Sequence, residues 1–124
     1  MDRLLSGRRV LVVEDEMLVV MMIEDMLADL GCKSVTSAAT VDKALALINA
    51  QIFDVALLDV NLNGNDSHPV AEALSARGVL VVYSTGNTGQ SLRDGYSERP
   101  VLKKPFKYEE LVAVLTRLKL APIE

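Results

Sequence analysis

Acidic side chains follow directly after two short apolar runs of the sequence. Glu14, Asp15 and Glu16 come after the run RVLVV, and Asp59 ends the run DVALLD. Carboxylate oxygens are the ligands that Mg²⁺ and Ca²⁺ prefer in proteins, and a carboxylate can also attack a phosphoryl group. These positions indicate a cation site or phosphoryl chemistry, provided that the fold brings them together.

A hydroxyl group and an ammonium group follow two later apolar runs. Thr85 ends the run VLVVYST, and Lys104 ends the run VLKK. A transferring phosphoryl group needs the charge on its oxygens neutralised, and an amine together with a cation can do this. A hydroxyl can bond a phosphoryl oxygen as well. The residue types therefore fit phosphoryl transfer to Asp59.

The elements that carry these residues alternate between two hydrophobic periods. Short β-branched apolar runs predict buried strands, and longer runs with apolar residues three or four apart predict amphipathic helices. We expect strands at 9–13, 33–38, 54–59, 79–85 and 101–104, and helices at 17–31, 40–50, 67–77 and 107–119. The stretch 86–100 holds three glycines and a terminal proline, so at best a short, irregular helix is expected there.

This alternation predicts an α/β fold, a doubly wound five-stranded parallel sheet with helices on both faces. We expect the flavodoxin-like strand order 2-1-3-4-5, in which the first and third strands are neighbours. Ligands bind such sheets beyond the carboxyl ends of the strands, where the strand order reverses. Glu14, Asp15 and Asp59 are therefore predicted to converge at that edge.

The converging carboxylates would outnumber the single ammonium group of Lys104. Carboxylates so close together repel one another and take up protons unless a cation binds between them. A small set of hard oxygen ligands favours Mg²⁺ with retained waters over a dedicated calcium cage. The backbone carbonyl of Asn61, two residues after Asp59, is a further candidate ligand.

Four motifs together resemble the response-regulator receiver domain of two-component signalling. VVEDE matches the acidic pair of that family, LLDVNL its phosphoacceptor strand, VVYSTG its hydroxyl strand and VLKKPF its lysine-proline strand. Each motif is weak alone, but four in this order at strand ends are specific. The resemblance runs from about Arg9 to Leu118.

The resemblance implies a role for each candidate site residue. Asp59 would accept a phosphoryl group from a partner phosphohistidine, while Thr85 and Lys104 would bond that group. Asp15 would bind the metal directly, and Glu14 directly or through water. Asp59 and the Asn61 carbonyl would complete a site for Mg²⁺ or Mn²⁺.

Further positions matter in the family that the sequence resembles. The bond before Pro105 would be cis, and Asn61 and Asn87 stand where the family tunes self-dephosphorylation. The aromatic residue that the family often carries three places before its lysine is Val101 here, so its usual coupling cannot be carried over. The glycine-rich stretch 86–100 takes the place of a helix on the output face, and we expect it to be mobile and to be ordered by phosphorylation.

The composition of the chain limits which kinds of partner it can bind. The chain of 124 residues suits one domain, and its net charge of −4 with no basic cluster argues against nucleic acid. Its longest apolar run has seven residues, whereas a membrane span needs about 20. We expect a cytoplasmic, stand-alone receiver domain over 1–124, with a core at about 9–119 and no output domain. The apolar excess of the helix at 17–31 leaves a homodimer or partner contact open.

The predicted function is a phosphoacceptor switch rather than an enzyme, since only Asp59 itself would be phosphorylated and dephosphorylated. The donor would be a sensor histidine kinase or a histidine phosphotransfer protein, and the output would be contact with a downstream effector protein or phosphoryl relay. One alternative is a small Mg²⁺-dependent phosphatase of the haloacid-dehalogenase type, although such enzymes usually carry an acid where this chain has Asn61. Another is a receiver-like interaction module that is never phosphorylated.

Overall fold

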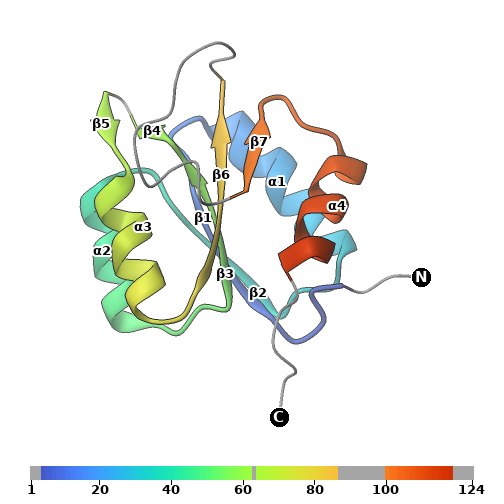
Figure 1. Ribbon diagram of the computed structural model, residues 1–124, viewed down its shortest axis with the longest axis horizontal. Coiled ribbons are helices and arrows are strands. Elements are labelled where there is room, and N and C mark those ends of the chain that lie inside the picture. The colour runs from blue at the N-terminus through green and yellow to red at the C-terminus, as the bar shows by residue number, and fades with distance from the viewer. Residues whose placement is uncertain (1–3, 63, 87–99, 119–124) are drawn as a thin grey trace.

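A five-stranded parallel sheet forms the centre of the computed structural model, which describes residues 4–62, 64–86 and 100–118 (Figure 1). The strand order is β2-β1-β3-β6-β7. These labels denote the five sheet strands in chain order, so the predicted order 2-1-3-4-5 is confirmed. The strands are β1 (Arg9–Val13), β2 (Ser34–Ala38), β3 (Val55–Asp59), β6 (Leu80–Thr85) and β7 (Val101–Lys103).

Helices cover both faces of the sheet, as predicted for a doubly wound fold (Figure 1). One face carries α1 (Met17–Asp29) and α4 (Tyr108–Leu118), and the other carries α2 (Val41–Ala50) and α3 (His68–Ala76). None of the helices in the described ranges is long and apolar enough to cross a membrane.

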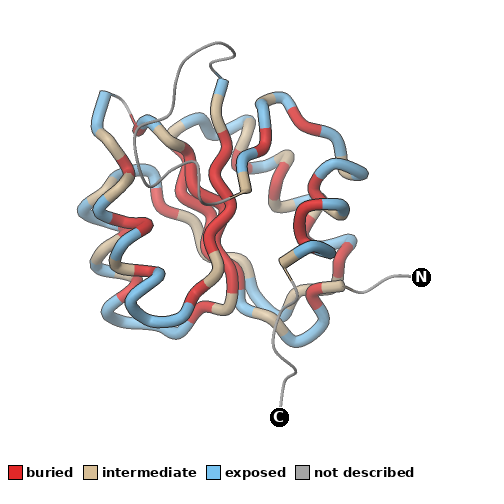
Figure 2. Tube along the Cα trace, viewed as in Figure 1, coloured by how far each residue is buried: buried red, intermediate tan, exposed pale blue. Residues whose placement is uncertain are grey.

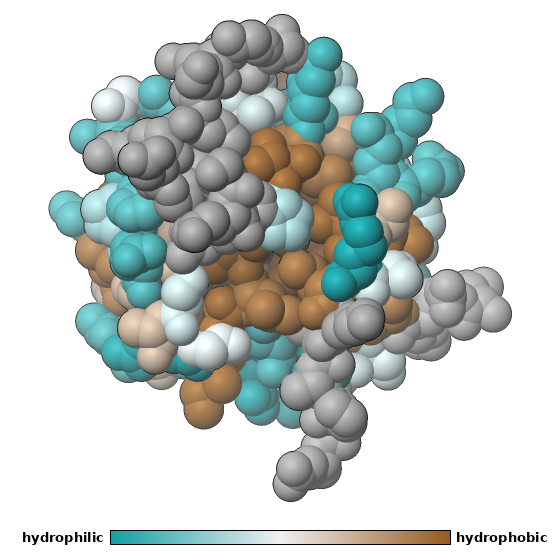
Figure 3. Space-filling model, viewed as in Figure 1, coloured by the Kyte–Doolittle hydropathy of each residue, from teal (hydrophilic) through white to brown (hydrophobic). Residues whose placement is uncertain are grey.

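Two apolar clusters, one on each face of the sheet, form the core. Successive residues of β1 alternate between them: Leu11 and Val13 pack with α2 and α3, while Val10 and Val12 pack with α1 and α4. Buried residues concentrate on the central strands in Figure 2, and every residue of β3 is buried. Figure 3 shows apolar residues gathered between α3 and α4 on the face in view. Burial on both faces explains why the strands are continuous apolar runs.

Local signals set the ends of the helices. The Thr40 hydroxyl accepts a hydrogen bond from the Lys43 N–H at 3.1 Å and caps α2. Pro69 lies in the first turn of α3, where its missing N–H costs nothing. Gly31 follows α1 with a φ of 80°, a conformation that glycine adopts without strain.

The segment after β3 contains a short hairpin where the sequence predicted only a loop. Strands β4 (Asn61–Leu62) and β5 (Asn65–Asp66) pair in antiparallel fashion. The Asn61 side-chain oxygen accepts a hydrogen bond from the Gly64 N–H at 2.6 Å, and this bond closes the turn. Strands of two residues are too short to show an alternating hydrophobic pattern, so the sequence could not reveal them. The predictions for 87–99, including mobility, lie outside the described residues.

Candidate functional site

The carboxyl ends of four neighbouring strands meet at one edge of the sheet. Val13 of β1 pairs with Leu58 of β3, and Asp59 pairs with Ser84 of β6. Strand β7 then lies beside β6. Because all these strands are parallel, the residues that follow them share this edge.

The predicted convergence of the acidic residues is confirmed. Glu14, Asp15 and Asp59 each place a carboxylate oxygen within 4.8 Å of the others. Glu14 is 2% exposed and Asp59 is 6% exposed, whereas Asp15 is half-buried. No other group of three such ligands occurs among the described residues. We call Glu14, Asp15 and Asp59 the acid cluster.

Lys104 lies between two members of the acid cluster. Its Nζ atom is 3.0 Å from Glu14 Oε1 and 3.1 Å from Asp59 Oδ2. The Lys104 N–H donates to the Thr85 carbonyl at 2.7 Å, which ties the end of β7 to the end of β6. The peptide bond from Lys104 to Pro105 is cis, as predicted. The ammonium group is thus held inside the site.

Backbone N–H groups hold the remaining oxygens of the two buried acids. The Glu16 N–H donates to Glu14 Oε2 at 3.2 Å, and the Asn61 N–H donates to Asp59 Oδ1 at 3.2 Å. In both cases the donor is two residues further along the chain, a local pattern that acidic side chains often adopt. Each buried carboxylate therefore has one oxygen on Lys104 and the other on the backbone, and both are fixed in orientation.

Burial and mutual repulsion govern the electrostatics. Burial raises the pKa of Glu14 from 4.5 to about 7; the hydrogen bond from Lys104 opposes this shift, and the charge of Asp59 adds to it. Burial alone would lower the pKa of Lys104, but the hydrogen bonds to Glu14 and Asp59 outweigh it, so that pKa is raised. Lys104 therefore stays charged within the site.

The donor set of the acid cluster fits a small, hard divalent cation. All three side chains offer oxygen, and no cysteine or histidine belongs to the described group. Such ligands suit Mg²⁺ or Mn²⁺ better than zinc. Asn61 begins β4 two residues after Asp59 and donates its N–H to Asp59 Oδ1, and its backbone carbonyl remains a predicted ligand.

Among the remaining residues, the structure describes Thr85 and Glu16 but not Asn87. Thr85 is the last residue of β6, at the same edge as Asp59, and is half-buried; its bond to a phosphoryl oxygen remains a prediction. Asn87 lies outside the described residues. Glu16 was given no role from the sequence, yet its Oε1 lies 3.8 Å from Lys104 Nζ. In the sequence, only the position of Glu16 within the acidic run 14–16 pointed to the site. Its contact with Lys104 depends on where β7 ends in the fold.

An apolar groove of about 370 Å³ adjoins the site. Glu16 lies at the groove, whose other lining residues are Leu18, Val19, Met22, Gly86, Lys104 and Pro105. On the same helix Met17, Leu18 and Met21 are 70%, 81% and 53% exposed. The first turns of α1 therefore present apolar side chains to solvent, and of these Leu18 lines the groove together with Lys104.

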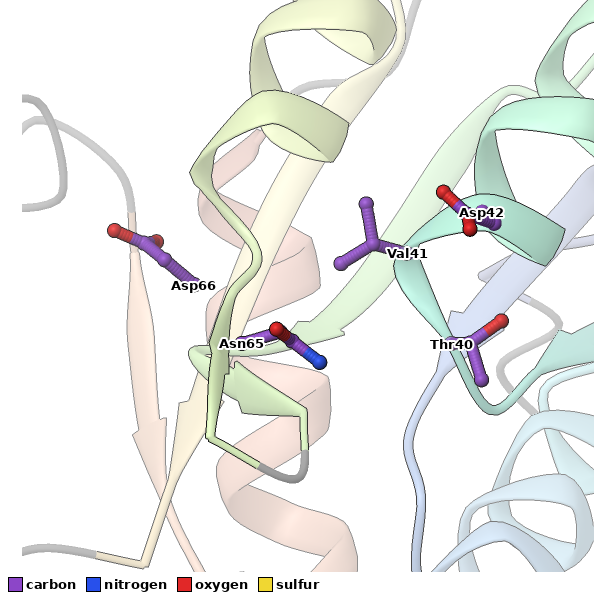
Figure 4. A pocket seen from close by; sticks show the side chains of 5 residues that line it. All are labelled: Thr40, Val41, Asp42, Asn65 and Asp66. Atoms are coloured by element: carbon purple, nitrogen blue, oxygen red, sulfur yellow. The ribbon is translucent and has the colours of Figure 1, made fainter.

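A second cavity, of about 450 Å³, lies between the start of α2 and the β4–β5 hairpin (Figure 4). The side chains of Asp42 and Asp66 stand at opposite sides of it in Figure 4. Asp66 Oδ1 accepts a hydrogen bond from the His68 N–H at 2.8 Å, at the start of α3. This cavity therefore lacks a converging set of ligands among the residues described.

Comparison with known proteins identifies a family over most of the chain. The model of the response regulator receiver domain matches residues 10–116. The solution structure of SdrG from Sphingomonas melonis Fr1 is 41% identical, covers 95% of this chain and 98% of its own, and superposes with a TM-score of 0.81. The BeF3-activated conformation of SdrG from Pseudomonas melonis Fr1 is 41% identical over 91% and 97% of the two chains, with a TM-score of 0.79.

A third similar structure is the receiver domain of the sensor histidine kinase PA1611 from Pseudomonas aeruginosa PAO1. It is 31% identical over 90% of this chain and 97% of its own, with a TM-score of 0.77. Its structure has a magnesium ion coordinated in the active-site cleft. The search of curated proteins found no match.

Proposed function

The chain belongs to the response regulator receiver domain family, and on that premise we propose that it is a signalling switch that carries a phosphoryl group on Asp59. One observation carries the proposal: the buried carboxylate of Asp59 lies 3.1 Å from the Lys104 ammonium and within 4.8 Å of the other acids. A carboxylate nucleophile beside an ammonium and two further acids that could hold a cation is an arrangement suited to phosphoryl transfer.

The transfer exchanges one bond for another. A carboxylate oxygen of Asp59 attacks the phosphorus of a phosphohistidine, and an O–P bond forms while the N–P bond breaks. The electron pair of the broken bond returns to the imidazole nitrogen of the donor, which takes up a proton. Lys104 passes from the Asp59 carboxylate to the phosphoryl oxygens, and the Thr85 hydroxyl bonds one of them.

Glu14, Asp15 and Asp59 would hold Mg²⁺ or Mn²⁺, with the Asn61 carbonyl as a further ligand. The magnesium ion in the cleft of the PA1611 receiver domain supports this assignment. When bound, the cation neutralises charge on the transferring group. The hydrogen bonds from the Glu16 and Asn61 N–H groups fix the orientation of Glu14 and Asp59, the two buried acids that would hold the cation.

We propose a protein as the phosphoryl donor, either a sensor histidine kinase or a histidine phosphotransfer protein. Exposed Leu18, which lines the groove beside Lys104, supports this, because exposed apolar surface near a reactive group favours protein docking, and Met17 and Met21 are exposed on the same helix. A donor of this kind uses ATP in the cytoplasm, and we place the domain there.

The output that we propose is protein contact with a downstream effector, or relay of the phosphoryl group. The BeF3-activated conformation determined for SdrG supports a change of conformation on phosphorylation in this chain as well. We propose no catalysis on outside substrates: the chain would promote only the phosphorylation and dephosphorylation of its own Asp59. The phosphatase alternative loses support because Asn61 cannot act as an acid, and its side chain bonds the Gly64 N–H.

Mass spectrometry after incubation with acetyl phosphate and Mg²⁺ tests the proposal. We expect the wild-type protein to gain the mass of one phosphoryl group. Asp59→Asn and wild type with EDTA should gain none, while Asp25→Asn, which removes an exposed acid from α1, should behave as wild type. A phosphoryl group on Asp59→Asn, or none on the wild type, would contradict the proposal.

A further inference from the structure

Glu16 precedes α1 at the N-cap position, but its side chain makes no capping hydrogen bond. A residue at this place usually caps the first turn through a short side chain. The Glu16 carboxylate lies instead 3.8 Å from Lys104 Nζ, and its side chain is 67% exposed. The side chain therefore reaches away from its own helix and toward the end of β7.

The Lys104 ammonium lies near three carboxylates, two of which belong to the acid cluster while the third, Glu16, does not. Glu14 and Asp59 contact the ammonium at 3.0 and 3.1 Å and belong to the acid cluster. Their other oxygens already accept backbone hydrogen bonds. A cation that enters the acid cluster must therefore compete with Lys104 for the same two side chains.

We propose that Glu16 is a positioning residue. When a divalent cation binds to Glu14 and Asp59, Glu16 holds the displaced Lys104 ammonium at the rim of the site. Among the described residues, Glu16 is the one carboxylate that pairs with Lys104 from outside the acid cluster. The inference rests on the proposed function, because it assumes that the acid cluster binds a cation before phosphoryl transfer.

Glu16 is important because, among the described residues, the Lys104 ammonium has few other groups nearby that could accept its hydrogen bonds once it leaves Glu14 and Asp59. If the ammonium stays between Glu14 and Asp59, it repels the entering cation. If it leaves them, it faces a groove whose walls include Leu18, Val19 and Pro105, which cannot accept its hydrogen bonds. An exposed ion pair is weak, so Glu16 can receive the ammonium and later release it to a phosphoryl group.

Calorimetric titration with Mg²⁺ tests this coupling. We expect Glu16→Gln to weaken Mg²⁺ binding about two- to fivefold, which is the range for losing one exposed ion pair. The matched control Asp25→Asn removes one negative charge from the same helix and should bind Mg²⁺ as wild type does. A Glu16→Gln affinity equal to that of the control would overturn the inference.

A double-variant comparison separates the lysine contact from a general charge effect. In the Lys104→Met background, Glu16→Gln should change Mg²⁺ affinity no more than Asp25→Asn does. If Glu16→Gln weakens Mg²⁺ binding by the same factor with and without Lys104, then Glu16 acts through long-range charge alone and the inference fails. Circular dichroism of each variant establishes that it is folded.

The NMR signal of the Lys104 ammonium provides a readout that does not depend on phosphorylation. With Mg²⁺ bound, the signal should stay visible in wild type, because Glu16 slows its exchange with water, and should be lost in Glu16→Gln. Without metal it should be visible in both. An unchanged signal in Mg²⁺-bound Glu16→Gln would overturn the inference, whereas failure of acetyl phosphate to modify wild type would overturn the proposed function instead.

Discussion

Lys104 Nζ lies 3.0 Å from Glu14 Oε1, although 90 positions of the chain separate the two residues. The same ammonium contacts Asp59 Oδ2 at 3.1 Å, so one lysine pairs with the buried acid that follows β1 and with the one that ends β3. An internal cation therefore occupies the side chains that a divalent metal would use. Binding of a divalent cation at the acid cluster would therefore change the surroundings of Lys104, and with them the stability of the fold.

Replacing Lys104 should make the fold depend on metal. Lys104→Met leaves Glu14 and Asp59 buried without their common partner, and losing one member of a buried ion pair costs about 3 kcal/mol or more. We expect this loss in urea unfolding with EDTA, and a larger gain of stability from Mg²⁺ in the variant than in wild type. Equal Mg²⁺ stabilisation of both proteins would show that Lys104 does not compete with the metal.

Removing Asp15 should weaken metal binding while the fold persists. Asp15 is half-buried and belongs to the acid cluster, but no described ion pair depends on it. Losing a ligand should cost at least as much as losing a residue that supports a ligand, on the order of tenfold in affinity. Calorimetry of Asp15→Asn measures this change, and thermal unfolding with EDTA should match wild type. Wild-type Mg²⁺ affinity in Asp15→Asn would remove Asp15 from the site.

The raised pKa of Glu14 predicts how stability depends on pH. The folded protein binds the Glu14 proton more tightly than the unfolded chain does, because the pKa rises from 4.5 to about 7 on folding. The free energy of unfolding should therefore fall as pH rises from 4.5 to about 7, by up to about 3 kcal/mol in the absence of metal.

The control for this pH dependence is Glu14→Gln, which keeps a hydrogen-bond acceptor for Lys104 but does not titrate. Urea unfolding in EDTA at several pH values compares the two proteins. Their difference in stability should change between pH 4.5 and 7 and then level off. A constant difference across that interval would contradict the raised pKa.

Truncating the exposed apolar surface of α1 should slow transfer from a protein donor. Leu18 is 81% exposed beside the groove at Lys104. Removing an anchor residue from an interface typically costs 1–2 kcal/mol, so Leu18→Ala should lower the rate from a phosphorylated histidine kinase about fivefold or more. The rate with acetyl phosphate should not change.

Ile52→Ala is the matched control, since Ile52 is 73% exposed and lies away from the site, before β3. It should leave both rates unchanged. If Leu18→Ala lowers the rates of phosphorylation by acetyl phosphate and by the kinase equally, the substitution affects the site itself and not docking of the kinase.

Ser67 should stabilise the connection between the hairpin and α3. It is fully buried, and its hydroxyl donates to the Val60 carbonyl at 3.0 Å. The Ser67 N–H also donates to that carbonyl, at 3.2 Å, so Ser67→Ala removes one bond and leaves no unpaired acceptor. We expect a loss of about 1 kcal/mol in urea unfolding. Unchanged stability would show that the hydroxyl bond contributes nothing net.

Sequence patterns alone predicted the sheet and the edge at which the site lies. Short apolar runs such as VALLD predict strands that are buried on both faces, and parallel strands end at the same edge of a sheet. The convergence of Glu14, Asp15 and Asp59 followed from strand order. The strands and helices could be predicted because hydrophobic period is a local property, and the strand order could be predicted because doubly wound sheets adopt few topologies.

Contacts between side chains were decided by the tertiary structure. The double pairing of Lys104, the burial that raises the pKa of Glu14, and the approach of Glu16 all depend on where β7 packs beside β6. The β4–β5 hairpin likewise depends on the Asn61–Gly64 bond and on Leu62 entering the core. The sequence determined which residues reach the site. Packing between segments far apart in the chain decided which of those residues touch. Side-chain distances of 3–4 Å depend on the geometry of the whole fold, and no local sequence pattern specifies them.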